Sequence, residues 1–348
     1  MVQEAAVTST SQTEQYIRLA FDRKLSKLHK LRLENKVDNT TPSLNFEFTK
    51  GYVTGQGVYR ADSEAVEGCE APCKGSGCEW PRLCKCLEYA AINEEALRRE
   101  DEQRYLAYKQ AKQDGEIPDT ADMPKRFPYH VAKDDFKPQT LVSFYREERF
   151  PIYECNPNCK CGRGCKSRVV QKGRKVPLTI FKTPNRGWGV CCDEDLIQGE
   201  FIDTYLGEII TNQEADRREQ AGSKDKQSYL YSLDKFVNED DLTTDNCYVV
   251  DGQYMGGPTR FINHCCEPNC RQYTVSYDKN NPRIYDIAFF AVANIPAGTE
   301  LTFDYQDKDE LEEDVAVRQR EAAQRNPANA GKQPCNCGAV KCRGFLWE

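Results

Sequence analysis

The 18 cysteines constrain the fold of this 348-residue chain more than any other feature, because most of them fall into three groups. These groups span residues 69–86, 155–165 and 335–342. The opening residues contain no apolar stretch typical of a secretory signal, so we expect the chain to stay in a reducing compartment. Clustered thiols in such a compartment favour metal ligation over disulfides. We therefore predict structural zinc sites.

The first two groups supply nine thiols and almost no histidine. Zinc takes four tetrahedral ligands, and thiolates are among its preferred donors. Three zinc ions can share nine thiolates if three of the sulfurs each bridge two metals. Cys-x-Cys pairs such as Cys84/Cys86 and Cys159/Cys161 suit bridging. Two separate four-cysteine sites with one spare thiol are the alternative. The nine predicted ligands are Cys69, Cys73, Cys78, Cys84, Cys86, Cys155, Cys159, Cys161 and Cys165.

The third group, Cys335, Cys337 and Cys342 in CNCGAVKC, lacks a fourth ligand. The distant segment NHCCEPNC offers Cys265, Cys266 and Cys270, one of which would complete an all-cysteine site. Such a zinc would fasten the C-terminal tail to that segment and would contribute directly to folding.

Composition limits the class of protein and its partners. Hydrophobic residues make up 39% and charged residues 30%, which allows a real core. The formal net charge of −7 excludes a protein held on nucleic acid mainly by its overall field and suits a basic partner. No apolar run approaches the roughly 18 residues of a membrane span, so we expect no contact with a membrane.

Helical periodicity appears at three places. Residues 1–15 are polar and are expected to be disordered, whereas apolar residues recur at helical spacing over residues 16–36. The opposite face of that predicted helix is basic, so it is either solvated or in contact with DNA. A second helix is predicted over residues 93–112 with Asn93 as its N-cap, inside a spacer that we expect to loop out of the zinc cluster. A third is predicted at 213–220.

Residues 168–305 change to short apolar runs broken by turn residues, which predicts a mostly β domain with short helices. Residues 306–334 combine an acidic run with NPANAGKQP and are predicted to be a mobile linker. The predicted strands lie in PLTIFKT, GEFIDTYLGEII, CYVVDG, RIYDIAFFAVA and ELTFDY.

Four short motifs stand out in the β region: RGWG at 186–189, YLGE at 205–208, RFINH at 260–264 and ELTFDY at 300–305. Singly, they are compatible with a turn, a metal site or a core strand. Together, with cysteine clusters on both sides, the sequence resembles the SET-domain protein lysine methyltransferases. It is most similar to the Su(var)3-9 class, which methylates lysine 9 of histone H3. VDGQYMGGPTRFINH and IYECNPNCKCGRGCKSRVVQKGR most resemble the filamentous-fungal members without a chromodomain.

The resemblance implies a SET fold of small sheets with a trinuclear zinc pre-SET domain and a zinc-binding post-SET tail. It divides the chain into an N-terminal tail and helix (1–44), a pre-SET domain (45–167, with the inserted spacer 87–154), a SET domain (168–305), a linker (306–334) and a post-SET segment (335–348). It also implies about four zinc ions, with Cys266 as the fourth ligand of the C-terminal site. Two departures are visible: the first cysteine pair is Cys69-x3-Cys73, where the family usually has Cys-x-Cys, and Cys265 replaces a serine.

The resemblance also assigns the reaction. The implied cofactor is S-adenosylmethionine, and Tyr305 matches the catalytic tyrosine. Tyr205, Phe303 and Trp347 match the walls of a channel for the substrate lysine. Phe303, where the family has phenylalanine or tyrosine, implies a trimethylated product. For Arg260 an ion pair that holds its loop is the structural alternative. The residues implied to bind the cofactor are Arg186, Gly187, Trp188, Tyr229, Arg260, Asn263 and His264.

The expected substrate is the extended, basic tail of histone H3, with Asp234 a candidate for reading a neighbouring arginine. This places the protein on nucleosomes in the nucleus. Two other functions fit the same motifs: a catalytically silent zinc-rich adaptor that only binds histone tails, and a methyltransferase for a non-histone lysine.

Overall fold

The structure is a computed structural model that describes residues 2–60, 66, 68–69, 84–130, 138–162, 164–221, 229–237, 242–278, 281–308, 313–326, 329 and 332–346. Three predicted site residues, Cys73, Cys78 and Trp347, lie outside these residues. None of the helices within the described part of the chain is long and apolar enough to cross a membrane.

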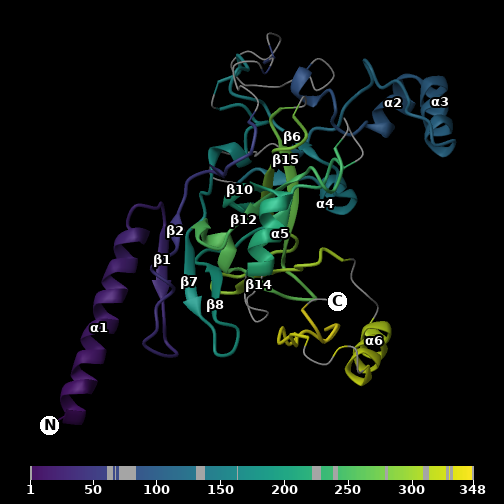
Figure 1. Cartoon of the computed structure of the whole chain (residues 1–348). Coiled ribbons are helices and arrows are strands. Elements are labelled where there is room, and N and C mark those ends of the chain that lie inside the picture. Colours follow the sequence, from purple (N-terminus) through teal and green to yellow (C-terminus); the bar gives the residue numbers. More distant parts are fainter. Residues whose placement is uncertain are drawn as a thin grey trace.

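Small sheets form the body of the molecule (Figure 1). The first has the order β1 (Leu31–Glu34), β7 (Leu178–Lys182), β8 (Trp188–Cys192), β17 (Glu300–Phe303) and β14 (Asn263–His264). The second has the order β11 (Leu230–Ser232), β12 (Tyr248–Asp251), β10 (Glu208–Thr211) and β3 (Val53–Thr54). The third has the order β6 (Ile152–Tyr153), β15 (Cys270–Ser276), β16 (Asp286–Ala291) and β9 (Phe201–Thr204). Among the described residues there are also two strand pairs: β13 (Met255–Gly256) with β2 (Glu47–Phe48), and β4 (Tyr129–His130) with β5 (Thr140–Leu141).

The strand predictions are confirmed, except that one predicted segment contains two strands instead of one. The segment GEFIDTYLGEII forms two strands, β9 and β10, which belong to different sheets. The chain turns between them at Gly207, where a Cβ atom would lie 2.3 Å from the carbonyl oxygen of Asp251. Only glycine allows this close approach of two backbones. The short, alternating apolar runs therefore produce the expected mostly β domain with short helices.

The N-terminal helix differs from the prediction at both ends. Helix α1 runs from Val2 to Leu25, so it includes residues expected to be disordered and stops before Lys36. Alanine, glutamate and glutamine early in the chain favour the helix. Residues 31–34 form β1, parallel to β7, after a left-handed turn at Lys30 with φ of 46°. Leu31 and Leu33 are buried while Arg32 and Glu34 are exposed, which is the period of a strand.

The spacer between the first two cysteine groups, which is predicted to loop out of the zinc cluster, packs against the β domain. Its end forms β6, which pairs with β15, and its buried residues Tyr129, Leu141 and Tyr145 share a core with Phe290. The predicted helix is divided into α2 (Glu94–Glu100) and α3 (Glu102–Gln113). Asn93 caps α2 as predicted, because its side chain accepts a hydrogen bond from the backbone of Ala96 at 3.2 Å.

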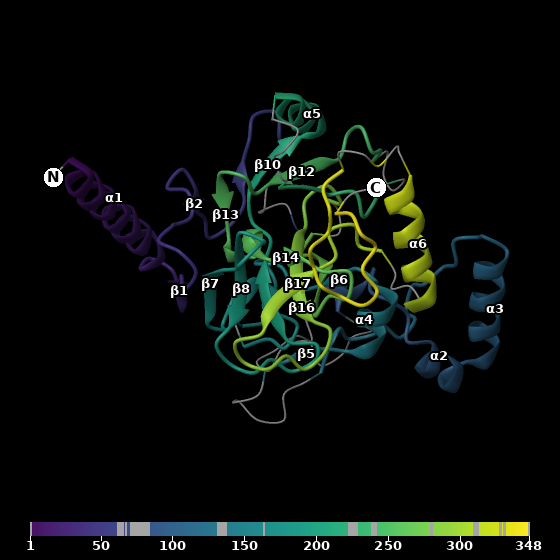
Figure 2. The same ribbon diagram turned by 90° about the horizontal axis from the view of Figure 1, so that it is seen from below.

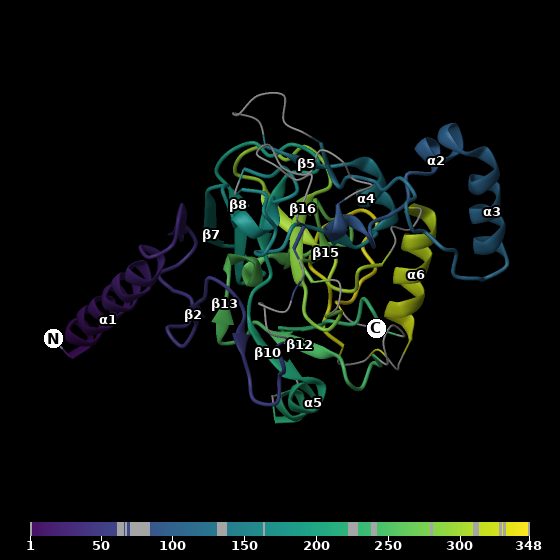
Figure 3. The same cartoon turned by 90° about the horizontal axis from the view of Figure 1, so that it is seen from above.

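The remaining helices in the described part of the chain are α4 (Ser143–Glu148), α5 (Asn212–Ala221) and α6 (Glu313–Arg325), and short 3-10 turns there cover Lys85–Leu87, Val170–Lys172 and Pro258–Phe261. Helix α5 confirms the prediction at 213–220. Helix α6 lies inside the region predicted to be a mobile linker, since the stretch VAVRQREAAQR consists largely of good helix formers. Figure 2 shows α6 beside the C-terminal segment, and it shows α1 and the α2–α3 pair on opposite sides of the sheets. The opposite view in Figure 3 agrees.

Candidate functional site

The motifs converge because β14 and β17 are neighbours. These strands are parallel, with Asn263 opposite Thr302 and His264 opposite Phe303. The other edge of β17 pairs with β8, which begins at Trp188. Motifs that are far apart in the sequence are therefore held side by side in one sheet.

The turn before β8 brings an arginine and a glycine to this sheet. Gly187 has a φ of 72°, in the left-handed region, and nothing lies within 4 Å of where a Cβ atom would be. The backbone of Arg186 donates to the Thr183 hydroxyl at 2.9 Å, and the Thr183 backbone donates to the Gly187 carbonyl at 2.8 Å. The turn is therefore fixed by its own hydrogen bonds, with an open surface at Gly187.

Glu300 joins this turn to β14, a role that the sequence analysis missed. Its carboxylate forms an ion pair with Arg186 and accepts a hydrogen bond from the Asn263 amide at 2.8 Å. The same amide donates to the Trp188 carbonyl at 3.1 Å. Glu300 opens the ELTFDY motif, so a carboxylate at its first position was the available signal. These contacts orient the Asn263 side chain.

Tyr305 follows β17 and contacts the site through its backbone and its side chain. Its hydroxyl donates to the Ile262 carbonyl at 3.0 Å, and its backbone N–H donates to His264 Nδ1 at 3.2 Å. The Tyr305 ring centroid lies 4.8 Å from that of Phe303. Burial raises the pKa of the Tyr305 phenol above its usual value, so this group stays protonated far into the alkaline range.

Tyr205 is buried nearby. Its hydroxyl donates to the Tyr229 carbonyl at 2.8 Å, and its ring centroid lies 5.9 Å from that of Tyr231. Burial raises the pKa of the Tyr205 phenol as well. Phe303 adds further aromatic surface, since its ring packs edge-on against that of Phe289 with the centroids 4.8 Å apart. Protonated phenols and aromatic faces are suited to an environment poor in water.

Arg260 is held by aromatic faces. Its guanidinium lies 4.1 Å from the Tyr229 ring centroid and 4.6 Å from those of Phe46 and Phe261. It also donates to the Gly252 carbonyl at 2.9 Å. Within the described residues, Arg260 contacts aromatic rings and backbone carbonyls. An ion pair holding its loop, the alternative to a role in cofactor binding, would require a carboxylate partner.

One pocket is lined by four of the ten predicted catalytic and cofactor-binding residues and is bounded by the C-terminal segment. Arg186, Asn263, His264 and Tyr305 line one side. Asn185 also lines it, and the sequence analysis did not single it out. The other side is formed by Gln333, Pro334, Cys335, Asn336, Cys337 and Leu346. The tail therefore closes a pocket built from the β domain.

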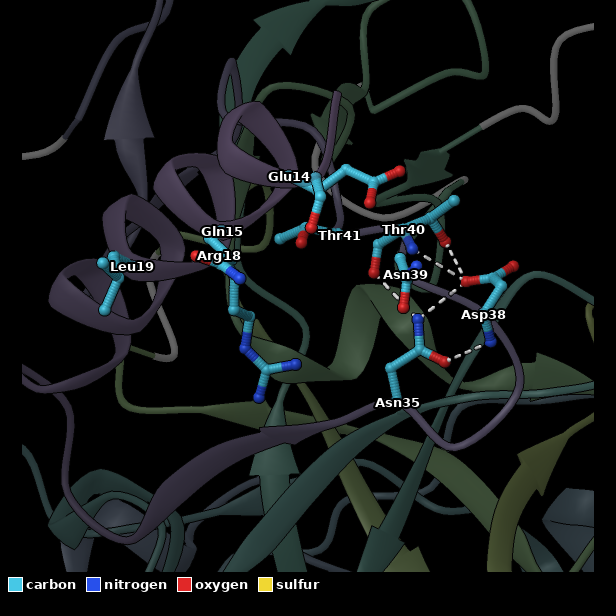
Figure 4. Close-up of a pocket in the computed structure, with 10 residues that line it drawn as sticks. Glu14, Gln15, Arg18, Leu19, Asn35, Asp38, Asn39, Thr40 and Thr41 are labelled. Atoms are coloured by element: carbon cyan, nitrogen blue, oxygen red, sulfur yellow. Dashed lines mark hydrogen bonds between the residues drawn. The ribbon is translucent and has the colours of Figure 1, made fainter. Parts of the chain in front are cut away.

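A second hollow, of about 480 Å³, lies between α1 and the loop of residues 35–41 (Figure 4). All of its lining residues except Leu19 have polar side chains, and in the loop the Asn35 amide donates a hydrogen bond to Asp38 at 2.8 Å. It contains none of the predicted site residues. The basic face of α1 is also partly used within the molecule, because Arg18 pairs with Asp22, and Lys24 with Glu47.

Four cysteines gather beside the first pocket. The sulfurs of Cys266, Cys335, Cys337 and Cys342 all lie within 4.8 Å of one another, whereas Cys265 is not part of this group. His264 Nδ1 accepts from Tyr305, so its Nε2 carries the proton and donates to Cys266 Sγ at 3.2 Å. The set of four thiols fits a tetrahedral zinc ion, and a donor to a ligating sulfur is typical of such sites.

Among the described residues, six of the nine N-terminal cysteines form three overlapping groups. These are Cys69, Cys86 and Cys159; Cys84, Cys86 and Cys155; and Cys155, Cys159 and Cys161. Cys86, Cys155 and Cys159 each belong to two groups, which is the sharing that bridging thiolates would show. Cys165 Sγ lies 3.7 Å from Cys155 Sγ. Hydrogen bonds from neighbouring thiols lower the pKa of Cys69 and Cys159 to about 7 and that of Cys86 to about 4, which favours the thiolates that zinc binds.

Asp234 is exposed and lies just after β11, in a turn where its carbonyl accepts from Val237 at 3.1 Å. Strand β11 is at the edge of its sheet and pairs only with β12 among the described strands. Asp234 is therefore near the outer strand of this sheet and outside the pocket lined by Tyr305 and His264.

Comparison with known proteins agrees with this geometry. The SET domain family model matches residues 187–306, and the Pre-SET motif model matches residues 23–168. The chain is 37% identical over 318 residues to the H3 lysine-9-specific histone-lysine N-methyltransferase KMT1 of Fusarium mangiferae, covering 90% of this chain and 87% of the relative. It is 36% identical over 323 residues to the H3 lysine-9-specific enzyme dim-5 of Neurospora crassa, covering 91% and 88%.

Solved structures give the same result. The Neurospora SET domain protein DIM-5, a histone lysine methyltransferase, aligns with a TM-score of 0.65 and 36% identity over 82% of this chain and 98% of that chain. Arabidopsis thaliana SUVH6 in complex with SAM aligns with a TM-score of 0.57 and 29% identity, over 90% and 53%. Fold and motifs thus define a SET-domain protein with a Pre-SET motif. The chain belongs to the histone-lysine N-methyltransferase family.

Proposed function

We propose that this protein transfers methyl groups from S-adenosylmethionine to lysine 9 of the histone H3 tail, on chromatin in the nucleus. The observation that carries the proposal is the single pocket where Arg186, Asn263, His264 and Tyr305 meet the cysteine-rich tail. The H3 lysine-9 specificity of the fungal relatives supports the choice of substrate. Residues 45–167 would hold a zinc cluster, 168–305 the transfer site, and 335–348 the closing segment, with 1–44 and 306–334 flanking them.

The residues around the pocket fit the cofactor, which supplies a methyl group on a positively charged sulfonium. The open surface at Gly187 allows close approach to the backbone, and the half-buried Trp188 offers a flat face. Asn263 is oriented by Glu300, and His264 is held by the Tyr305 backbone and Cys266. With Arg186, Tyr229 and Arg260, these residues would bind the cofactor.

The protein's part in the chemistry is to receive a neutral lysine amine. An ordinary lysine has a pKa near 10.4, so removing its proton at pH 7 costs about 4.6 kcal/mol. Desolvation between Tyr205, Phe303 and Trp347 would lower that pKa and with it the cost. A strong general base is then unnecessary. Tyr305 would orient the amine and stabilise the charge that develops near the methyl group.

Phe303 determines how many methyl groups are added in this proposal. Its ring packs between Phe289 and Tyr305 and has no hydroxyl with which to hold an amine. A methylated nitrogen therefore keeps the freedom to turn its lone pair toward the reacting carbon. The expected product is trimethyl-lysine.

Zinc would complete the site without taking part in the reaction. Three ions would lie among the nine N-terminal cysteines, with Cys86, Cys155 and Cys159 as the bridging ligands. A fourth would be bound by Cys266, Cys335, Cys337 and Cys342. The terminal ligands of the cluster would be Cys69, Cys73, Cys78, Cys84, Cys161 and Cys165.

The H3 tail would add as an extended strand at the edge of a sheet, with β11 as the candidate strand because Asp234 beside it is close enough to meet basic side chains. An additional DNA contact by α1 has less support, since Arg18 and Lys24 already pair with Asp22 and Glu47. Contact with the nucleosome would then rest mainly on the tail.

Methyl transfer from radiolabelled S-adenosylmethionine to an H3 tail peptide tests the proposal. We expect label in the natural peptide and none in a peptide where arginine replaces the target lysine. Binding of the tail without transfer would instead indicate a silent adaptor. Transfer to other lysine peptides but not to the H3 tail would indicate a non-histone substrate.

A further inference from the structure

The carboxylate of Asp304, the residue before Tyr305, is surrounded by donors. Oδ1 accepts hydrogen bonds from Arg343 Nη2 at 2.6 Å and from the Gln306 backbone at 3.0 Å. Oδ2 accepts from Arg343 Nη1 at 2.8 Å and from the Lys308 backbone at 3.2 Å. The side chains are nearly buried, 7% exposed for Asp304 and 12% for Arg343. Burial opposes ionisation, but the hydrogen bonds from Arg343 and from the Gln306 backbone, together with the positive charge of Arg343, outweigh it and hold the pKa of Asp304 below its usual value.

Arg343 lies in the cysteine-rich tail, directly after Cys342. Its backbone N–H donates to Cys266 Sγ at 3.4 Å, while its side chain reaches Asp304. The adjacent Gly344 accepts from the Cys335 backbone at 2.8 Å. One residue therefore contacts both a predicted metal ligand and the dipeptide that carries Tyr305.

The tail has a second contact with the residue after Tyr305. The side-chain amide of Gln306 donates to the Leu346 carbonyl at 2.8 Å, and Leu346 lines the pocket. The zinc ligands fix only the positions of four sulfur atoms, the last of them at Cys342. The course of the chain beyond Cys342, toward Leu346, depends on contacts such as that of Arg343.

We propose that Arg343 is a positioning residue for methyl transfer: its bidentate pair with Asp304 sets the tail against Tyr305 and thereby closes the pocket. This inference rests on the proposed function. A buried ion pair contributes little net stability, because desolvation offsets the attraction. The bidentate geometry does fix the two segments in one orientation. Its expected effect is therefore on the rate of transfer more than on folding.

The chain offers a matched control in Arg149, which pairs with Asp307. This pair is also bidentate, at 2.8 and 3.0 Å, and its acid is only three residues beyond Asp304. It differs in joining the end of α4 in the spacer, and in being more exposed, at 25% and 39%. Arg149→Ala thus breaks a similar contact without touching the tail.

The test compares Arg343→Ala, Arg343→Lys and Arg149→Ala in the full zinc-loaded chain. We expect Arg343→Ala to keep the wild-type zinc content but to lower kcat/KM by about tenfold or more, since small misplacements near the reacting atoms are costly. Hydrogen exchange of residues 335–346 should be faster in that variant. Arg343→Lys should recover part of the rate, and Arg149→Ala should stay within about twofold of wild type.

Equal kinetics and exchange in Arg343→Ala and Arg149→Ala would overturn the inference. Loss of zinc in step with loss of rate would overturn it too, because Arg343 would then act through the metal site. The double variant Arg343→Ala with Asp304→Asn removes the unpaired buried charge. We expect it to stay slow, and recovery of the wild-type rate would count against positioning. A wild-type protein inactive on every lysine peptide would refute the proposed function, while the exchange comparison would still decide the role of the pair.

Discussion

Two hydrogen bonds help to place Tyr305: its hydroxyl donates to the Ile262 carbonyl, and its backbone N–H donates to His264 Nδ1. Tyr305→Phe removes one hydroxyl and keeps the ring packing against Phe303. We expect the rate of methyl transfer to fall by more than about tenfold, a loss above roughly 1.4 kcal/mol, with the fold intact.

Tyr273→Phe is the control for this substitution. The Tyr273 hydroxyl also donates to a backbone carbonyl, that of Arg146 at 3.2 Å, but it lies in the separate core under β15 and β16. The control should leave the rate within about twofold of wild type. Circular dichroism should first show that both variants are folded. Similar rates of methyl transfer in the two would then mean that the Tyr305 hydroxyl takes no part in the reaction.

The pH dependence follows from the amine and the two phenols. Only the neutral lysine attacks, so the rate should rise by up to about tenfold per pH unit above neutrality. Because burial raises the pKa of both Tyr305 and Tyr205, their ionisation should not reduce the rate within that rise. A profile measured under conditions where chemistry limits the rate checks this. A flat profile from neutral to alkaline pH would contradict the mechanism.

Phe303→Tyr tests the product pattern. A hydroxyl added beside Phe289 and Tyr305 would hold the amine and occupy space needed by a methylated nitrogen. We expect the variant to stop at mono- or dimethyl-lysine, with the first transfer largely unchanged. Mass spectrometry of the peptide over time gives the answer. A general loss of rate with an unchanged product pattern would mean that Phe303 is only core packing.

The sequence motifs predicted which side chains line the pocket, but they did not predict the ion pairs that hold those side chains in place. Arg186, Asn263, His264 and Tyr305 lie in recognisable motifs, and the pocket contains all four. Glu300 and Asp304 stand in the same motif as Tyr305, but their roles depend on Arg186 and Arg343, which reach them across the fold. No spacing in the sequence encodes those partners.

Among the helices and strands, local periodicity was sufficient where one face is buried. Strands β7, β12, β16 and β17 coincide with the apolar runs that predicted them, and helix α5 coincides with the charge-rich segment that predicted it. The periodicity failed at β1, because residues 25, 28 and 31 fit a helix as well as a turn and a strand. It also failed for α6, where acidic neighbours concealed a helical stretch. Pairing with β7 made residues 31–34 a strand, and helix propensity made residues 313–325 a helix.

The C-terminal segment closes the pocket, and substitutions can distinguish the cysteines grouped there from a neighbouring thiol outside the group. Cys342→Ser removes one of the four grouped thiols and should abolish most activity while the main core stays folded. Cys265→Ser changes a thiol outside that group and should keep the zinc content and the rate close to wild type. Zinc analysis with a rate measurement on both variants checks this. Loss of zinc in Cys265→Ser would show that Cys265 is the ligand.

Across the whole chain, the two cysteine-rich regions differ in which part of the structure they stabilise. The overlapping cysteine groups are mostly buried and pack with Leu87 and Tyr153, so they form a core of their own. The four C-terminal thiols include two half-buried ones, Cys335 and Cys337, and close the pocket from outside. A chelator should therefore remove the C-terminal zinc first.

Native mass spectrometry during chelation, with methyl transfer assayed on the same samples, tests most directly whether a zinc-held tail completes the site. We expect about four zinc ions per chain at the start, and activity that disappears with the first ion lost while the circular dichroism spectrum is preserved. Activity that persists after the first zinc has left, or that disappears only when the chain unfolds, would contradict this role of the tail.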